Sequence, residues 1–237
     1  NKQGESVYDI KENSRGKYWI GVENGLIYYD PINADKVRYR AVPNDPNSLK
    51  SNQVRAILID AKDNLWIGTY GGGLSYLDVS TQTFTHFPSN LDDPGSLSNQ
   101  QVNDIAYHWD GNLWVGTTNG LNYINLDHNN LINSRIHQYR DTDSNSKPLR
   151  ASHVEEIYVE ENHVWFSTRF GGVNIFNRYG NPFMGYSTAA EAGKGLSHNT
   201  VSAFTQDNHG IMYISTDGGG INRFDPRDGS FRYIKHQ

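Results

Sequence analysis

The 237-residue sequence contains no cysteine, which excludes disulfide bonds, thiolate metal sites and cysteine nucleophiles. It has no run of about 18 apolar residues, so no segment is predicted to span a membrane as a helix. Lys and Arg number 21 against 26 Asp and Glu, and the formal net charge is −5. A mildly acidic chain without a basic block is not expected to bind nucleic acid.

The sequence also lacks the motifs that usually mark a catalytic or metal site. Its nine histidines are scattered without metal-site spacing, and neither a G-x-S-x-G motif nor a P-loop is present. The stretch 141–145 resembles the start of a calcium loop, but Ser146 and Ser152 replace the Gly and Glu that such a loop needs. We therefore expect no metal, no cofactor and no catalytic residue, although the many carboxylates leave a glycosidase-type pair open.

What the sequence does contain is a repeat, clearest in the stretch NLWIGTYGGG from Asn64 to Gly73. Five aromatic residues recur about 48 residues apart, and they are Trp19, Trp66, Trp114, Trp165 and Tyr213. Each unit opens with a short apolar segment, namely Val7–Ile10, Val54–Ile57, Val102–Ile105, Val154–Ile157 and Val201–Phe204. A polar turn, the aromatic segment, a glycine-rich turn and two further apolar runs follow.

Four short strands in a unit of this length are typical of a propeller blade. The sequence thus predicts an all-β fold, a β-propeller of four-stranded antiparallel blades in one domain over residues 1–237. The expected blades cover approximately 6–51, 52–99, 100–151, 152–198 and 199–237. Trp66 is expected to fill the space between neighbouring blades, Gly68 to allow close approach of a strand, and the glycines at 71–73 to form a tight turn with φ > 0.

The units resemble the propeller repeats of two-component regulators. The resemblance rests on Leu97-Ser98 before Val102, on the run Asp110–Thr117 (DGNLWVGT) and on the glycine run that precedes Leu74. It covers nearly the whole chain. The fourth unit departs from the pattern at Ser167, and the fifth at Tyr213 and Ser215, where we expect local repacking.

The resemblance implies the periplasmic sensor region of a hybrid two-component system histidine kinase. Such a region would be the extracytoplasmic part of an inner-membrane protein, attached through a transmembrane segment that this sequence does not contain and followed by a kinase or other output domain. Members of the family usually have seven blades per propeller, so we expect a fragment of a longer array. The alternative is a self-contained five-bladed ring. An open set of blades would expose apolar faces, which suggests pairing with a second copy as a homodimer.

Loops on a rigid scaffold commonly bind ligands, and two sets of loops should share one rim of the propeller. These are the segments before the first strands and the glycine-rich turns. The candidate ligand-binding residues on the turns are Tyr70, Arg169, Phe170, Asp217, Glu23 and Asn119. Those at the second position of the first strands are Arg55, Asn103 and Glu155. Aromatic faces beside hydrogen-bonding groups suit a saccharide.

Three functions are consistent with the sequence. The first is a ligand-sensing module that binds a small molecule or oligosaccharide, such as a polysaccharide breakdown product, and has no enzyme activity of its own. The second is a protein-interaction scaffold without a small ligand. The third is a propeller polysaccharide lyase or hydrolase. Binding of a small molecule separates the first from the second, and consumption of the oligosaccharide identifies the third.

Overall fold

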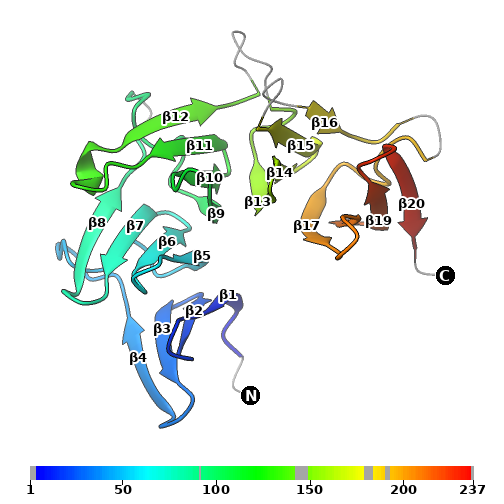
Figure 1. Ribbon diagram of the computed structural model, residues 1–237. Helices are drawn as coiled ribbons and strands as arrows, with labels where there is room; N and C mark the ends of the chain where they lie inside the picture. Colours follow the sequence, from blue (N-terminus) through cyan, green and yellow to red (C-terminus); the bar gives the residue numbers. More distant parts are fainter. Residues whose placement is uncertain (1–3, 91, 142–148, 179–183, 190–192, 236–237) are drawn as a thin grey trace. The chain divides into compact units, whose positions relative to one another are not determined.

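The computed structural model describes residues 4–90, 92–141, 149–178, 184–189 and 193–235. Within these residues the chain folds into five four-stranded antiparallel sheets and one short 3-10 helix, η1 (Leu131–Asn133) (Figure 1). Consecutive strands are neighbours in every sheet, so each sheet is a simple meander. The predicted fold, four-stranded antiparallel blades of a β-propeller, is confirmed.

The strands of each sheet follow one another in the sequence. The first sheet contains β1 (Val7–Glu12), β2 (Tyr18–Val22), β3 (Gly25–Asp30) and β4 (Asp35–Tyr39). The second contains β5 (Val54–Ile59), β6 (Leu65–Thr69), β7 (Gly73–Asp78) and β8 (Thr83–Phe87). The third contains β9 (Val102–Tyr107), β10 (Leu113–Thr117), β11 (Gly120–Asn125) and β12 (Arg135–Tyr139). The fourth contains β13 (Val154–Val159), β14 (His163–Thr168), β15 (Gly172–Asn177) and β16 (Met184–Tyr186). The fifth contains β17 (Val201–Gln206), β18 (Met212–Thr216), β19 (Gly220–Asp225) and β20 (Ser230–Ile234).

The contacts divide the chain into two compact units. The first unit comprises Asn1–Thr117 and Asn122–Gln138, and the second comprises Thr118–Leu121 and Tyr139–Gln237. The first three sheets therefore belong mainly to unit 1, and the last two to unit 2. The expectation of a single domain over residues 1–237 stays a prediction. In the described part of the chain, no helix is both long and apolar enough to cross a membrane.

The core lies between consecutive sheets, where the repeated tryptophans pack. Trp66 is 2% exposed and shares a cluster with Phe87 of its own sheet and with Val102 and Leu113 of the next sheet. Trp19 and Trp165 occupy the same place in two further clusters. A Cβ on Gly68 would lie 2.5 Å from Val102 Cγ1, so this glycine does allow the next strand to approach. Each of these three tryptophans thus joins two blades that could not bury their faces alone.

The three glycines at 71–73 in the second sheet do not all have the same role, although the sequence predicts one tight turn for all of them. Gly71 and Gly73 have φ of 102° and 72°, as the tight turn requires. Gly72 has no positive φ. Its missing Cβ instead leaves room for the backbone of Lys50 and Ser51, which a Cβ would approach to 2.8 Å. The middle glycine therefore serves the packing of the turn against the preceding loop.

Acidic residues at the end of the third strand hold the following turn. Asp78 accepts hydrogen bonds from the backbone N–H groups of Ser80 and Thr81. In the fifth sheet, Arg227 Nε and Nη2 donate to the two carboxylate oxygens of Asp225 at 2.8 and 2.7 Å. The hydrogen bonds from Arg227 lower the pKa of Asp225 to about 2.

This pKa predicts a loss of stability in acid. The carboxyl of Asp225 should titrate near 3.9 in the unfolded chain, so its stabilising effect is present above about pH 4 and is lost as the pH falls towards 2. The free energy of unfolding, measured by urea titration between pH 6 and pH 2, should therefore fall more steeply in the wild type than in Asp225→Asn. Parallel curves for the two proteins would contradict the assignment.

Candidate ligand-binding rim

The glycine-rich turns and the loops that enter the first strands form one rim of each unit. Within unit 1, the N–H of Tyr70 donates to Gln53 O, and the N–H groups of Gly71 and Gly73 both donate to Gln100 O in the loop before β9. Within unit 2, Arg169 N–H donates to His153 O and Gly172 N–H donates to Asn199 O. The turn of one blade is thus bonded both to its own entry loop and to that of the next blade.

A buried asparagine fixes the entry loop of three blades, a feature that the sequence analysis missed. Asn122 is fully buried, accepts a hydrogen bond from Ser98 N–H at 2.8 Å and donates to Val115 O at 3.0 Å. Asn174 and Asn222 accept in the same way from the N–H groups of Arg150 and Ser197. The rim is therefore positioned by the strand behind it.

Every first strand carries a β-bulge at its second residue. Val54 pairs with Thr69 and Ala56 with Gly68, which leaves Arg55 as the extra residue. The same register shift occurs in all five sheets, and the extra residues are Tyr8, Arg55, Asn103, Glu155 and Ser202. A bulge redirects the side chain it carries. The three first-strand candidates predicted from the sequence are thus all bulge residues.

Carboxylates next to two of these bulges bond the following first strand. Asp9 Oδ2 accepts from Ile57 N–H at 2.8 Å in unit 1, and Glu156 Oε2 accepts from Phe204 N–H at 2.9 Å in unit 2. These residues satisfy backbone donors on first strands, which form the unpaired edge of each sheet. They therefore fix the first strands, and with them the bulge residues, relative to one another within each unit.

In unit 1 the structure brings two predicted residues together with one that was not predicted. The guanidinium carbon of Arg55 lies 4.1 Å from the ring centroid of Tyr8 and 5.3 Å from that of Tyr70. Among the described residues, the buried Nε of Arg55 has no hydrogen-bond partner. Gly71 and Gln101, next to Tyr70, line a hollow of about 270 Å³ together with Ser89, Asn99 and Gln100.

In unit 2 the equivalent positions carry an ion pair. Glu155 Oε1 lies 3.4 Å from Arg169 Nε and 3.3 Å from His153 Nε2. Burial lowers the pKa of His153, and the Arg169 charge lowers it further against the opposing effect of Glu155. His153 is therefore neutral at pH 7, and the pair consists of Glu155 and Arg169. Two predicted residues, one from a bulge and one from a turn, again meet.

Phe170, beside Arg169, combines exposure with backbone strain. Its side chain is 74% exposed, and its φ of 69° is in the left-handed region that Gly71 and Gly218 occupy in other blades. A large residue in this conformation costs about 1–2 kcal/mol relative to glycine. Strain of this kind together with an exposed aromatic ring is typical of a binding position.

We expect Phe170→Gly to keep or raise the free energy of unfolding, by up to about 1 kcal/mol, because the left-handed strain is relieved. The same variant should bind a rim ligand more weakly if the ring contacts it. Urea unfolding and calorimetric titration on one preparation measure both effects, and Phe170→Asn, which tolerates this conformation, is the matched control. A clear loss of stability would show that the ring packs on the protein.

Of the remaining predicted residues, Glu23 lines a hollow of about 560 Å³ at its turn, together with Gly4, Glu5, Asn24, Arg38 and Arg40. Glu23 and Asp217 are exposed on their turns, and their N–H groups donate to Ser6 O and Thr200 O. Asn103 and Asn119 are half-buried and each makes contacts. The structure thus joins Arg55 with Tyr70 and Glu155 with Arg169. Tyr8 and His153 are additions that the sequence did not single out as site residues.

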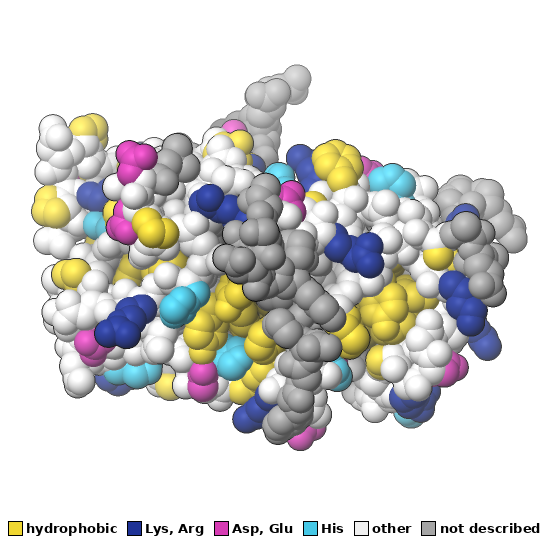
Figure 2. Space-filling view, turned by 90° about the horizontal axis from the view of Figure 1, so that it is seen from above, with side chains coloured by type: hydrophobic (Ala, Val, Ile, Leu, Met, Phe, Trp, Pro, Cys, Tyr) yellow, Lys and Arg dark blue, Asp and Glu magenta, His cyan; other side chains and the backbone are white. Residues whose placement is uncertain are grey.

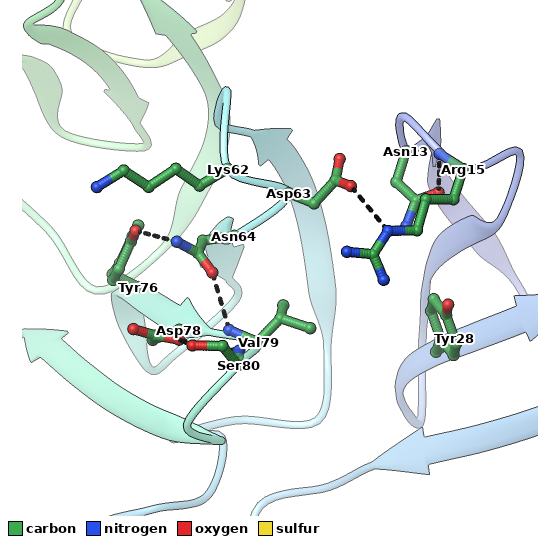
Figure 3. Close-up of a pocket in the computed structure, with 10 residues that line it drawn as sticks. All are labelled: Asn13, Arg15, Tyr28, Lys62, Asp63, Asn64, Tyr76, Asp78, Val79 and Ser80. Atoms are coloured by element: carbon green, nitrogen blue, oxygen red, sulfur yellow. Dashed lines mark hydrogen bonds and ion pairs between the residues drawn. The ribbon is translucent and has the colours of Figure 1, made fainter.

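A larger pocket lies at the opposite ends of the strands in unit 1, where no site was predicted. It measures about 600 Å³ and is lined by the residues drawn in Figure 3, from the first and second sheets. Its polar groups hold the turns themselves: Asn64 donates to Tyr76 Oη and accepts from Val79 N–H, and Asp63 accepts from Ser14 N–H. Because these groups are already hydrogen-bonded, the rim is the stronger candidate, although the hollow beside Tyr70 is smaller.

The surface and the described side chains add two observations. On the face drawn in Figure 2, cationic and acidic side chains of the described residues are scattered singly and do not form a basic block. In the part of the chain that the structure describes, no group of three His, Asp or Glu residues is placed to hold a metal ion. Residues 142–148 of the calcium-like stretch lie outside the described residues.

Comparison with known proteins gives a consistent set of matches. A family model described as "Two component regulator propeller" matches residues 48–71 and 195–218. The protein named Histidine kinase P4 of Formosa agariphila is 29% identical over 84 residues, which cover 32% of this chain and 6% of that protein.

Solved structures match over nearly the whole chain. The extracellular domain of the hybrid two component system BT3049 from B. thetaiotaomicron matches with a TM-score of 0.78 at 21% identity, and the match covers 95% of this chain and 29% of that one. The corresponding domain of BT4673 from the same organism matches with a TM-score of 0.56 at 16% identity, over 97% of this chain and 37% of that one. The chain thus spans well under half the length of the proteins it resembles.

Proposed function

The chain carries two-component regulator propeller repeats, and we propose that it is the extracytoplasmic ligand-sensing module of a two-component signalling protein. The observation that carries the proposal is the family match, which occurs in a repeat of each compact unit. The solved structures with the same fold are described as extracellular domains of two-component systems, which supports the location. The module itself is proposed to have no enzyme activity.

The proposed ligand is a saccharide, such as an oligosaccharide released from a polysaccharide. Each rim supports this proposal by itself, because the rings of Tyr8 and Tyr70 in unit 1 and the ring of Phe170 in unit 2 lie beside hydrogen-bonding or charged side chains of their own unit. Aromatic faces pack on the C–H faces of sugars, and polar groups bind their hydroxyls. The ligand would act by binding one arrangement of the blades, or of a pair of copies, more tightly than another.

A thermal-shift screen of the purified chain against a panel of oligosaccharides tests this function. A ligand present at 100 times its Kd stabilises a protein by about 2.7 kcal/mol, which for a chain of this size raises Tm by roughly 5–10 °C. Calorimetric titration then gives Kd, and chromatography of the ligand before and after incubation shows whether it is consumed. The absence of a shift with every sugar favours a protein-interaction scaffold, and consumption of the sugar favours a lyase or hydrolase.

The proposed homodimer is tested on the same preparation. Light scattering after size-exclusion chromatography, with and without the ligand found in the screen, measures the mass in solution. A dimer that forms or tightens when the ligand is present would link binding to signalling, because the ligand must then favour the dimeric state. A monomer under both conditions would contradict pairing of the isolated chain.

A further inference from the structure

We infer that the rim of unit 1 recognises a carboxylate, so that the sensed saccharide is an acidic one that bears uronate groups. The inference rests on the proposed function and specifies the ligand of the same rim. It follows from one side chain, Arg55, and from what surrounds it.

Arg55 is a cation without an anionic partner. It stands on the bulge of β5, half-buried, with its guanidinium held against the rings of Tyr8 and Tyr70. Within the described residues no carboxylate pairs with it, and its Nε is buried without a hydrogen bond. A guanidinium carries five N–H donors, and leaving such donors unsatisfied costs free energy. The two terminal nitrogens are not among the buried atoms without a partner, so they are the donors that a bound carboxylate would reach.

Three other arginines of the chain, Arg38, Arg169 and Arg227, each pair with a carboxylate. Arg38 forms two hydrogen bonds with the Glu5 carboxylate, at 2.7 and 2.8 Å, and Arg227 does the same with Asp225. At the bulge of the fourth sheet, Glu155 is paired with Arg169. The equivalent turn position in the second sheet is Tyr70, so the charge of Arg55 is stacked on rings and not neutralised. Arg55 differs from these three in that rings and not a carboxylate lie against its guanidinium, and we infer that a bound anion takes the place of the missing carboxylate.

A carboxylate fits this position best. Rings that contact a guanidinium through its π-system leave the donors at its edge available, and a carboxylate accepts two of them at once. Gln53, whose carbonyl accepts from Tyr70 N–H, and Gln101, which forms a β-bridge with Tyr70, carry neutral amide side chains, which suit the hydroxyls of a sugar. Stacking rings, a forked cation and amides together describe a site for a sugar acid more closely than one for a neutral sugar.

The test compares matched acidic and neutral ligands on the intact chain. The probes are oligogalacturonates and oligoalginates of two to six residues, the same oligosaccharides with their carboxyl groups reduced to alcohols, and sulfated oligosaccharides of similar length. Calorimetric titration is carried out at 50 and 300 mM salt. We expect an acidic probe to bind, its reduced form to bind at least about tenfold more weakly, and binding to weaken in high salt.

Two variants connect the result to Arg55. Arg55→Gln should lower the affinity for the acidic probe by about tenfold or more and leave the affinity for the reduced form unchanged. Arg55→Lys should restore only part of the affinity for the acidic probe, because lysine lacks the two parallel donors of the guanidinium. Arg15→Gln, at the opposite ends of the strands and with a side chain 79% exposed, is the control and should bind like the wild type. Thermal unfolding of Arg55→Gln without ligand shows that the variant is folded. Tyr70→Leu removes one ring and keeps the charge of Arg55, and its affinity for the acidic probe is a second measurement at the same site.

The outcomes separate the inference from the function on which it rests. The inference of carboxylate recognition is overturned if the acidic and reduced probes bind with equal affinity. It is also overturned if the acidic probe binds Arg55→Gln as well as it binds the wild type. Neither result contradicts the proposed saccharide sensor. If only the sulfated probes bind, the rim recognises a sulfate ester and not a carboxylate, which also overturns the inference. If no oligosaccharide of either kind binds, the saccharide function itself fails.

Discussion

Replacement of Trp66 by alanine is expected to lower the free energy of unfolding by about 3–5 kcal/mol. The indole is 2% exposed and lies among side chains of two sheets, including Phe87, Leu97 and Val102. Its Nε1 also donates to Tyr107 Oη of the third sheet at 3.2 Å. The variant therefore loses apolar burial, leaves a cavity and breaks a hydrogen bond that joins two blades.

Urea or thermal unfolding of the wild type and Trp66→Ala measures this loss. Trp109→Ala is the matched control, because Trp109 is half-buried in the turn before β10 and is not a repeat position, so its loss should be about 1 kcal/mol or less. Tyr107→Phe isolates the hydrogen bond and should cost about 0.5–1.5 kcal/mol. A Trp66→Ala protein that loses no more than Trp109→Ala would show that the blades do not depend on this contact.

The blades could be predicted because each repeat position has a single dominant physical role. A tryptophan at a fixed spacing must be buried, and Gly68 must lack a Cβ because Val102 occupies that space. Repetition reinforced each of these signals. Substitutions that break the pattern are absorbed locally: Ser167 stands where glycine was expected, and its Oγ accepts a hydrogen bond from Glu156 N–H.

The site was predictable only in part, because side-chain direction depends on features that the sequence does not display. Turn position alone was sufficient to select Tyr70 and Arg169. The bulges that redirect Tyr8 and Glu155 were not recognised: the Val-x-x-Ile spacing puts two apolar residues on one face only if the strand carries an extra residue, but this signal is short and does not show which way the extra side chain points. The pocket in Figure 3 was missed for a similar reason: Asn64 and Asp63 had the character of ordinary turn residues, and their contacts confirm that use.

The second large effect is expected at Asn122, where Asn122→Leu should lower the free energy of unfolding by about 2–3 kcal/mol. The substitution has nearly the same volume, so the cost comes from polar groups. Ser98 N–H loses its acceptor, and Ser98 Oγ and Val115 O lose their donor, in a site where Asn122 is fully buried. A buried polar group without a partner costs about 1–3 kcal/mol. Asn129→Leu, at an exposed loop position, is the control and should change stability by less than about 0.5 kcal/mol.

The repeat itself indicates how the Asn122 effect should be distributed. Ile27 and Ser75 occupy the equivalent position in the first two sheets, so a blade can form without this asparagine. The loss should therefore be concentrated in the entry loop, where Ser98 also bonds Thr117 Oγ1 at 2.8 Å. Amide hydrogen exchange at Ser98 should accelerate more than exchange in the β10 strand.

Because this loop is bonded to the turn at Gly71 and Gly73 through Gln100, its loosening should also weaken ligand binding at the rim. Unchanged exchange at Ser98 would show that the loop is held by its other contacts and that the buried asparagines do not position the rim.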